Sequence, residues 1–326
     1  MKLRTLSVIV FAVLTMLVSV AANADIELKR DITYKQQDGY VDILKGEQVV
    51  AKYVYKDAAK PYLYPVHAPN GEIVTKNVSD AASGPVNPSF WVGYGDVNGI
   101  DFWNEGEKTG KITQTTIDFD SQSPGHWNIH TINHWIGPNK ERIAADERRY
   151  SFLSCEYGTL ISTRIKIMAG MDVKFADHKD GFLAFRLADG MQLAGGKGHI
   201  LNSDGKKDAE CVGKRARWCD YTGEVNGKTC GITIFDSPSN HGYPTYWNVT
   251  DYGLLSANPF GGQSYTGDEK NNSALALSTR DSTTFIYIAL IHDGKIEAEK
   301  LNQLADQIVA KGSKQPKRGD MPKPKN

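Results

Sequence analysis

Residues 91–105, with the sequence WVGYGDVNGIDFWNE, combine carboxylates, amides and large aromatic rings in one glycine-rich segment. Loops of this kind let backbone and side chains converge on a ligand. An aromatic ring offers a sugar an apolar face to stack on, and carboxylate or amide oxygens accept hydrogen bonds from its hydroxyls. The alternative is a turn whose Asp and Asn cap backbone N–H groups while the rings fill the core. The candidates are Asp96 and Asp101 as acid and base, with Trp91, Asn98 and Trp103 as ligand contacts.

Lysine and arginine alternate with aromatic residues in GKRARWCDY at residues 213–221. Further aromatic residues follow in YWNVTDYG at residues 246–253. Arg and Lys held among such rings can bind a carboxylate or a sugar hydroxyl. The alternative is a set of solvated cations on the edges of strands. The ligand contacts predicted from these segments are Lys214, Arg215, Trp218, Trp247 and Asn248.

Three histidines, His126, His130 and His134, are spaced by four residues. On a helix they would share one face with neighbours about 6 Å apart, as in a metal site. Pro-Gly before the segment and Gly-Pro-Asn after it are instead typical of the ends of a strand. On a strand, residues four apart lie about 13 Å from each other, too far to share one ion. We therefore predict a polar strand face and no metal ligands.

Signatures of several enzyme classes are missing from the sequence. It contains no G-x-S-x-G, P-loop, H-E-x-x-H or complete dinucleotide fingerprint, so no cofactor is predicted. Without Lys2 and Arg4, 36 basic residues face 38 acidic ones. This balance argues against a general nucleic-acid binder, which needs a basic face. The predicted partner is a small molecule or an oligosaccharide.

The N-terminus has the pattern of a cleavable signal peptide. Lys2 and Arg4 precede an apolar run from Leu6 to about Val20, and Ala22-Asn23-Ala24 follows it. This small-x-small pattern predicts cleavage before Asp25, so residues 1–24 form the signal. The alternative is a single membrane anchor, which the run is barely long enough to be. We expect a periplasmic or secreted protein with no stable membrane insertion after cleavage.

Short β-rich runs separated by Gly, Asn, Asp and Pro dominate the rest of the chain. Residues 40–44 and 49–55, for example, predict two strands around a tight turn at Gly46. Many short strands and few helical stretches predict an all-β fold, an antiparallel β-sandwich or supersandwich. Apolar residues at helical spacing over residues 297–310 add a short C-terminal helix. We predict one domain at residues 25–311 and a disordered basic tail at 312–326.

Four cysteines, Cys155, Cys211, Cys219 and Cys230, follow the predicted signal. In an oxidising compartment they could form two disulfides, with three possible connectivities. Cys211 paired with Cys219 or with Cys230 is compatible with their closeness in sequence. Buried free thiols are the alternative. No C-x-x-C pair occurs, so zinc binding and thiol redox chemistry have little support.

Taken together, these segments resemble the bacterial family labelled methane oxygenase PmoA-like, over residues 26–295. The matching motifs are KPYLYP at 60–65, GDVNG at 95–99 with DFW at 101–103, FAD at 175–177 with Lys179 and Arg186, GKR at 213–215 with Trp218, Asp236 with Asn240, PTYW at 244–247, and ANPFG at 257–261. Because a methane monooxygenase subunit is embedded in the membrane, the family label is a poor guide to function. The resemblance implies a secreted β-sandwich protein in a family associated with carbohydrate use. It adds Asp177 as a third catalytic carboxylate, and Lys179, Arg186 and Asn240 as ligand contacts.

Two departures from the family pattern bear on the chemistry. Family members carry a His-Pro-His-His run where residues 84–87 are Gly-Pro-Val-Asn, and a histidine where this chain has Asn248. Three hypotheses follow. The first is an enzyme that hydrolyses or eliminates a glycan or modified sugar. The second is a non-catalytic carbohydrate-binding protein that stacks sugars on its tryptophans. The third, a metal-dependent oxygenase, needs ligands that the chain lacks.

Overall fold

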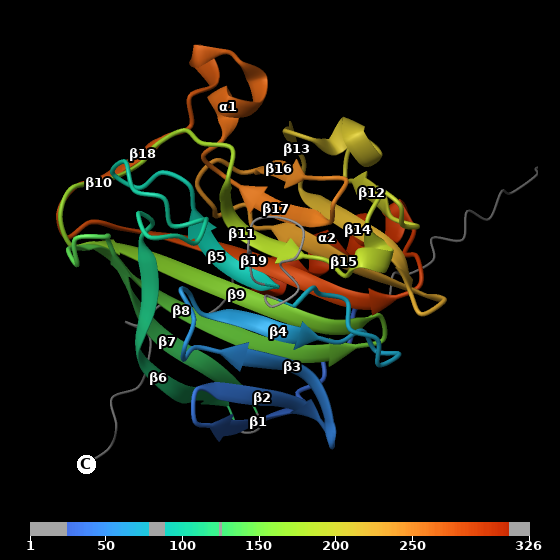
Figure 1. Cartoon of the computed structure of the whole chain (residues 1–326). Helices are drawn as coiled ribbons and strands as arrows, with labels where there is room; N and C mark the ends of the chain where they lie inside the picture. The colour runs from blue at the N-terminus through green and yellow to red at the C-terminus, as the bar shows by residue number, and fades with distance from the viewer. Residues whose placement is uncertain (1–24, 78–88, 124–125, 313–326) are drawn as a thin grey trace, which may run out of the picture.

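Two large antiparallel sheets packed face to face form the protein (Figure 1). The structure is a computed structural model that describes residues 25–77, 89–123 and 126–312. The nine-stranded sheet has the order β1-β2-β3-β4-β5-β11-β17-β16-β13. Its strands are β1 Ile32–Gln37, β2 Tyr40–Lys45, β3 Gln48–Val54, β4 Tyr62–Val66, β5 Phe90–Tyr94, β11 Gly181–Arg186, β17 Leu254–Asn258, β16 Tyr246–Val249 and β13 Lys214–Arg215.

The second sheet has eight strands in the order β12-β14-β15-β19-β9-β8-β7-β6. They are β12 His199–Asn202, β14 Trp218–Val225, β15 Lys228–Asp236, β19 Ser282–Asp293, β9 Gly158–Ala169, β8 Arg142–Cys155, β7 His126–Ile136 and β6 Lys111–Ser123. A two-stranded sheet pairs β10 Val173–Phe175 with β18 Leu275–Leu277, and the two α-helices of the described residues are α1 Gly262–Thr266 and α2 Ala298–Gly312. The prediction of an all-β antiparallel sandwich with a short C-terminal helix is confirmed.

The predicted signal peptide and all but one residue of the predicted tail lie outside the described residues. The tail's first residue, Gly312, ends α2. Within the described part of the chain, neither helix has the length and apolar content needed to cross a bilayer.

Local sequence explains the hairpin of β2 and β3. The two strands pair from Tyr40 opposite Val54 to Lys45 opposite Gln48, with a register shift between Ile43 and Leu44. Gly46 in the turn has a φ of +61°, a left-handed conformation that glycine adopts without a Cβ penalty. Val41 and Ile43 are fully buried, while the alternating residues are part-exposed. Period-2 patterning therefore fixes which face of this hairpin meets the core.

Helix α2 covers part of the outer face of the eight-stranded sheet. Leu301, Leu304 and Ile308 recur at helical spacing and pack on Trp218 and other apolar residues of β14, β15 and β19. The indole N–H of Trp218 donates to Asn302 Oδ1 at 2.9 Å. Trp218 is therefore a core residue beneath this helix, and the structure corrects its prediction as a ligand contact because no ring face is left for a sugar.

The histidine segment is the strand β7, as its flanking residues predict. His130 and His134 lie on its outer face, since the alternating residues Ile129, Asn133 and Trp135 are buried in the sandwich. His130 Nε2 lies 3.0 Å from Glu147 Oε1 on β8. Among the residues that the structure describes, no group of three or more potential metal ligands comes together.

All four cysteines are free and buried, the second of the two alternatives left open by the sequence. Cys211 and Cys219 lie close enough for their thiols to interact, and Cys211 Sγ donates to the carbonyl oxygen of Lys206 at 3.2 Å. Burial, and secondarily this neighbour, raises the pKa of the Cys219 thiol. The Cys219 thiol is therefore kept neutral, and both cysteines fill the core as small apolar side chains.

A polar network is buried between the two sheets on β7 and β8. Asp146 accepts hydrogen bonds from Arg148 Nε and Nη2 at 2.8 and 2.7 Å, from Trp135 Nε1 at 2.7 Å and from Asn133 Nδ2 at 2.6 Å. All four side chains are 0% exposed. Burial alone would lower the pKa of Arg148, but the attraction of Asp146 outweighs it and raises that pKa. Arg148 therefore stays charged inside the sandwich.

Candidate functional site

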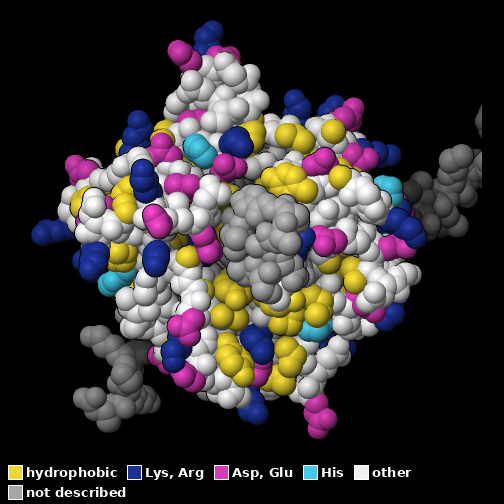
Figure 2. Space-filling view, in the orientation of Figure 1, with side chains coloured by type: hydrophobic (Ala, Val, Ile, Leu, Met, Phe, Trp, Pro, Cys, Tyr) yellow, Lys and Arg dark blue, Asp and Glu magenta, His cyan; other side chains and the backbone are white. Residues whose placement is uncertain are grey.

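Aromatic and apolar side chains gather on the outer face of the nine-stranded sheet, away from the second sheet. Figure 2 looks onto this face and shows hydrophobic side chains above and below its centre. Phe90, Val92 and Tyr94 of β5 point into the core, so Trp91 between them points outward. Its ring lies 4.8 Å from that of Trp103, measured between centroids. Together with Tyr62, Ala184 and Leu254 they form what we call the outer-face cluster.

Strand register explains how this cluster is built. Trp91 lies opposite Tyr62 on β4 and Ala184 on β11. Ala184 lies opposite Ser256 on β17, which in turn lies opposite Asn248 on β16. These five residues form one row across the sheet, and with strands about 4.8 Å apart Asn248 is about 14 Å from Trp91. The small side chain at Ala184 leaves room for the Trp91 and Trp103 rings beside it.

Three hydrogen-bond donors on this face lack partners. The indole N–H of Trp91 and the hydroxyl of Ser89 are buried with no hydrogen bond in the described structure. Arg186 lies opposite Ser89, whose carbonyl accepts from its backbone N–H at 2.6 Å. Across the residues described, the Arg186 guanidinium has no hydrogen bond or ion pair, and it lies 4.5 Å from the centroid of the Tyr252 ring. Buried donors without partners are rare in native proteins, so a ligand would complete this face.

A buried lysine contacts the backbone of Trp103. Lys60 is 1% exposed, and its Nζ donates to the carbonyl oxygen of Trp103 at 2.8 Å and lies 3.5 Å from Glu105 Oε1. Burial lowers the pKa of Lys60, and Glu105 and then Asp101 oppose that shift. Burial, followed by the charge of Glu105, raises the pKa of Tyr62. Ionisable groups perturbed in this way beside an aromatic cluster are typical of functional sites.

The two candidate carboxylates of the glycine-rich loop have different surroundings. Asp101 lies next to the outer-face cluster, where its Oδ1 accepts from the backbone N–H groups of Trp103 and Asn104 at 2.7 and 3.0 Å. Asp96 accepts instead from Gly99 N at 2.8 Å. Asn98, at a φ of +55°, binds the backbone of Asp172 and Lys174 beside β10. Both carboxylates thus cap turns, and only Asp101 adjoins the tryptophan pair.

Asp177 holds together the segment around α1. Its carboxylate accepts hydrogen bonds from the backbone N–H groups of Gln263, Ser264 and Ser273, at 2.8, 2.8 and 2.9 Å, and from the Ser273 hydroxyl at 3.1 Å. Partial burial would raise its pKa, but these hydrogen bonds outweigh burial and lower it. The structure thus gives Asp177 a structural role, and its catalytic role stays a prediction.

Trp247, another predicted ligand contact, lies away from the outer-face cluster. Trp247 is 0% exposed in the main core, and its Nε1 donates to the carbonyl oxygen of Ala216 at 2.9 Å, which corrects its prediction as a stacking platform. Trp91 and Trp103 are only 1% and 3% exposed, so the accessible rings are those of Tyr62 in the cluster and of Tyr252 beside Arg186.

The remaining predicted contacts bind the protein's own backbone or face solvent. Asn240 donates to Asp236 Oδ1 at 2.7 Å and pairs with both backbone groups of Ile286. Arg215 donates to three carbonyls of the 242–244 turn. Lys179 has an exposed side chain, and Lys214 is exposed on the edge strand β13. Asn248, with 9% exposure, donates to the carbonyl oxygen of Lys179 at 3.1 Å.

Sequence reasoning missed Lys60, Tyr62, Ser89 and Glu105 as site residues. Lys60 and Tyr62 lie in the KPYLYP motif, where a lysine between an apolar turn and a strand gives no sign of burial. Ser89 and Arg186 are 97 positions apart and meet only because β5 pairs with β11. Pairing of distant strands is not encoded in any local pattern.

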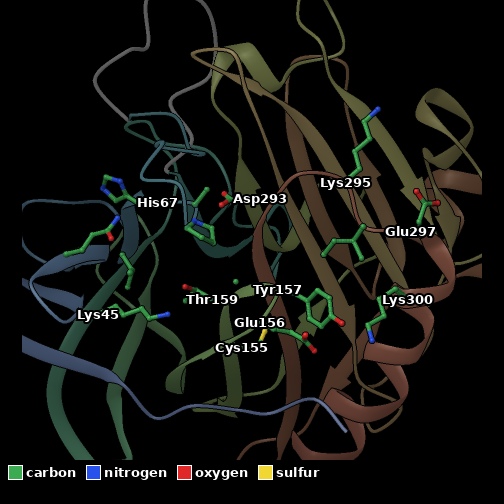
Figure 3. A pocket seen from close by; sticks show the side chains of 16 residues that line it. Lys45, His67, Cys155, Glu156, Tyr157, Thr159, Asp293, Lys295, Glu297 and Lys300 are labelled. Atoms are coloured by element: carbon green, nitrogen blue, oxygen red, sulfur yellow. The ribbon is translucent and has the colours of Figure 1, made fainter. Parts of the chain in front are cut away.

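A separate cavity of about 730 Å³ opens where the β2–β3 hairpin, the β8–β9 turn and the start of α2 meet. Figure 3 shows basic lysines and acidic carboxylates around it, with Tyr157 beside Lys300. Lys300 Nζ lies 5.0 Å from the centre of that ring, and Lys45 pairs with Asp31 at 3.6 Å. None of its lining residues has a buried side-chain polar atom that lacks a hydrogen-bond partner. The cavity therefore carries less sign of a missing ligand than the outer-face cluster does.

Comparisons place the chain against known proteins. A model described as "Family of unknown function (DUF6807)" matches residues 40–306. No curated protein matches the sequence.

Among solved structures, the chain is similar to a glycoside hydrolase family 97 enzyme from Pseudoalteromonas sp. strain K8 (TM-score 0.39, 9% identity, 80% of this chain). It is also similar to the GH36 α-galactosidase AgaB from Geobacillus stearothermophilus (0.39, 10%, 80%) and to galactose 1-epimerase from Lactobacillus acidophilus NCFM (0.35, 10%, 82%). The chain spans 35% and 41% of the two glycosidases and 100% of the epimerase. At these TM-scores we draw no function from the likeness.

Proposed function

We propose that this chain, which belongs to the DUF6807 family of unknown function, binds a carbohydrate at the outer-face cluster. The observation that carries the proposal is the set of buried donors without partners, Trp91 Nε1 and Ser89 Oγ, beside aromatic side chains. Sugars supply what this face lacks, because their oxygens accept hydrogen bonds and their C–H faces stack on rings. Tyr62 and Tyr252 offer the partly exposed rings for that stacking.

Binding should be visible as thermal stabilisation of the protein comprising residues 25–326. With a panel of neutral and acidic oligosaccharides, a ligand at a hundredfold excess over its Kd should add about 2.7 kcal/mol to the free energy of unfolding. Tyr62→Ala should weaken the best ligand about 10-fold, because a ring contact contributes on the order of 1 kcal/mol or more. Tyr157→Ala, at the separate cavity, is the matched control and should leave Kd unchanged. The opposite pattern would place the site in the cavity, and a panel without any shift would refute the carbohydrate function.

A catalytic function is the second candidate, and the Lys60–Glu105 pair favours it. Glu105 is 27% exposed in its side chain, so it can reach a ligand, and the Nζ of buried Lys60 lies 3.5 Å from its Oε1. A carboxylate in this position can transfer a proton during hydrolysis or elimination of a glycosidic bond. Asp101 is a second carboxylate whose charge acts on Lys60.

Glu105→Gln is expected to lower turnover of a bound glycan about 100-fold or more while its Kd changes less than threefold, since general acid–base groups contribute roughly 10²–10⁴-fold. Product release would be followed by chromatography of reducing ends and unsaturated sugars. Glu107→Gln, an exposed position of the same loop, is the control and should keep full activity. Equal turnover in both variants would leave a binding protein without this acid–base role.

We also propose that the protein acts in the periplasm or outside the cell. The support is the N-terminal sequence, with Lys2 and Arg4, an apolar run and Ala22-Asn23-Ala24. Similarity to the PmoA-like family remains a proposal based on the motifs at residues 60–65, 95–103 and 244–261.

A further inference from the structure

The donors without partners on the outer face share one chemical property. Trp91 can only donate through its indole N–H, and Arg186 has five N–H donors and no acceptor. Ser89 adds a hydroxyl, which donates and accepts. Sites for neutral sugars generally combine donors with carboxylate or amide acceptors, because each sugar hydroxyl both donates and accepts hydrogen bonds. Three neighbouring groups that mainly donate are suited to a ligand group that only accepts.

Strand pairing brings the three groups together. Ser89 lies directly opposite Arg186, with their backbones joined by a hydrogen bond of 2.6 Å. Trp91 is the next outward-facing residue along β5 and lies diagonally from Arg186, across strands β5 and β11. Diagonal neighbours on one sheet face are about 7–8 Å apart at their Cα atoms, within reach of long side chains. An oxyanion between them could accept from all three.

Charge and exposure favour the same ligand. The guanidinium carbon of Arg186 lies 4.5 Å from the centre of the Tyr252 ring, a contact that uses none of the N–H donors in a hydrogen bond. Asp189, whose charge acts on Arg186, is already bound by Lys76 Nζ at 2.7 Å and Gln192 Nε2 at 2.6 Å. Tyr252 is 43% exposed, so this end of the cluster opens to solvent. Arg186 thus carries a positive charge that no carboxylate in the described residues pairs with.

We propose that Ser89, Trp91 and Arg186 form a carboxylate-binding subsite, so that the ligand of the outer-face cluster is an acidic sugar, a uronic acid residue of an oligosaccharide. This inference rests on the proposed carbohydrate function. Arg186 binds the carboxylate through its N–H edge, a charge-assisted and often bidentate contact. The Trp91 indole and the Ser89 hydroxyl donate to the same oxygens, while Tyr62 packs against the sugar ring.

The test compares three ligands on the same protein by calorimetry at constant ionic strength: uronic acid trisaccharides, their methyl esters and the corresponding neutral trisaccharides. The acid should bind at least about 10-fold more tightly than the ester or the neutral sugar, since hydrogen bonds to a charged group contribute roughly 10- to 100-fold in Kd. The esters need no protein variant, so this comparison holds even if a substitution impairs folding.

Arg186→Met, which keeps the length of the stem, should abolish the preference for the acid. Arg186→Lys should retain part of it, because lysine keeps the charge but loses the fork of donors. Lys214→Met removes an exposed cation from the edge strand and is the matched control that should keep the preference. Equal binding of acid, ester and neutral sugar would overturn the carboxylate subsite and leave the carbohydrate function standing. An acid preference that survives in Arg186→Met would place the carboxylate elsewhere, and no binding of any sugar would refute both.

Discussion

Replacement of Asp146 by alanine is expected to lower the free energy of unfolding by about 3–5 kcal/mol. The carboxylate of Asp146 accepts four hydrogen bonds, two of them from Arg148, and every side chain involved is fully buried. Its removal leaves the Arg148 guanidinium charged and unpaired between the sheets, and deprives the Asn133 and Trp135 donors of their acceptor. An uncompensated buried charge is among the costliest changes that a single substitution can make. Urea unfolding followed by tryptophan fluorescence measures the loss.

The double variant Asp146→Leu with Arg148→Met separates the charge from the shape of the pair. It should recover part of the stability lost in Asp146→Ala, because it removes both charges and fills the space with apolar atoms. Asn133 and Trp135 still lack their acceptor in this variant, so recovery should be incomplete. A loss below about 1 kcal/mol in Asp146→Ala would show that water reaches this network and solvates Arg148. That result would contradict the burial described here.

The second large effect concerns Asp236, whose contribution to stability should depend on pH. Asp236 is 2% exposed, and burial raises the pKa of its carboxyl from 3.8 to about 7 against the hydrogen bonds from Asn240 and Thr245 N. Between these two values the folded protein holds a proton that the unfolded chain releases. The stabilisation is therefore fully present below about pH 4 and is lost as pH rises to about 7, a loss of about 4 kcal/mol by linkage.

The measurement is the difference in unfolding free energy between wild type and Asp236→Asn at several pH values. Asn cannot ionise, so the cost of the substitution itself is the same at every pH. The change of the difference with pH therefore reports only the titration of Asp236. That difference should fall by about 4 kcal/mol from pH 4 to pH 7 and stay flat above it. A difference that is level across this range would show that Asp236 is ionised in the folded protein throughout.

Sequence patterns predicted the architecture because its signals are local. The β2–β3 hairpin follows from alternation on either side of Gly46, and α2 from apolar residues at helical spacing. The strand conformation of β7 follows from the Gly and Pro residues at its ends. Each of these features is fixed by a period or a turn residue within about ten positions, which is the distance over which backbone preference and side-chain alternation act.

Only some of the site residues could be predicted from the sequence. Trp91, Trp103, Asp101 and Arg186 were named from residue type, and the fold brings them to or beside one face of the sheet. Trp247 and Trp218 have the same type and similar neighbours, yet they lie in the core. β5 is buried along its whole length, so burial on both faces removes the alternation that would tell Trp91 from an inward residue.

The sequence by itself therefore determined an antiparallel β-sandwich, its C-terminal helix and the glycine-rich loop as a place where aromatic and acidic residues meet. Only the tertiary structure decided which of those residues share a face and which of their polar atoms lack a partner. Ser89 and Arg186 meet through the pairing of β5 with β11, and Lys60 is buried by its contact with Trp103 and Glu105. Whether a donor is satisfied depends on groups far away in the chain, and only the folded arrangement of strands brings those groups into hydrogen-bonding distance.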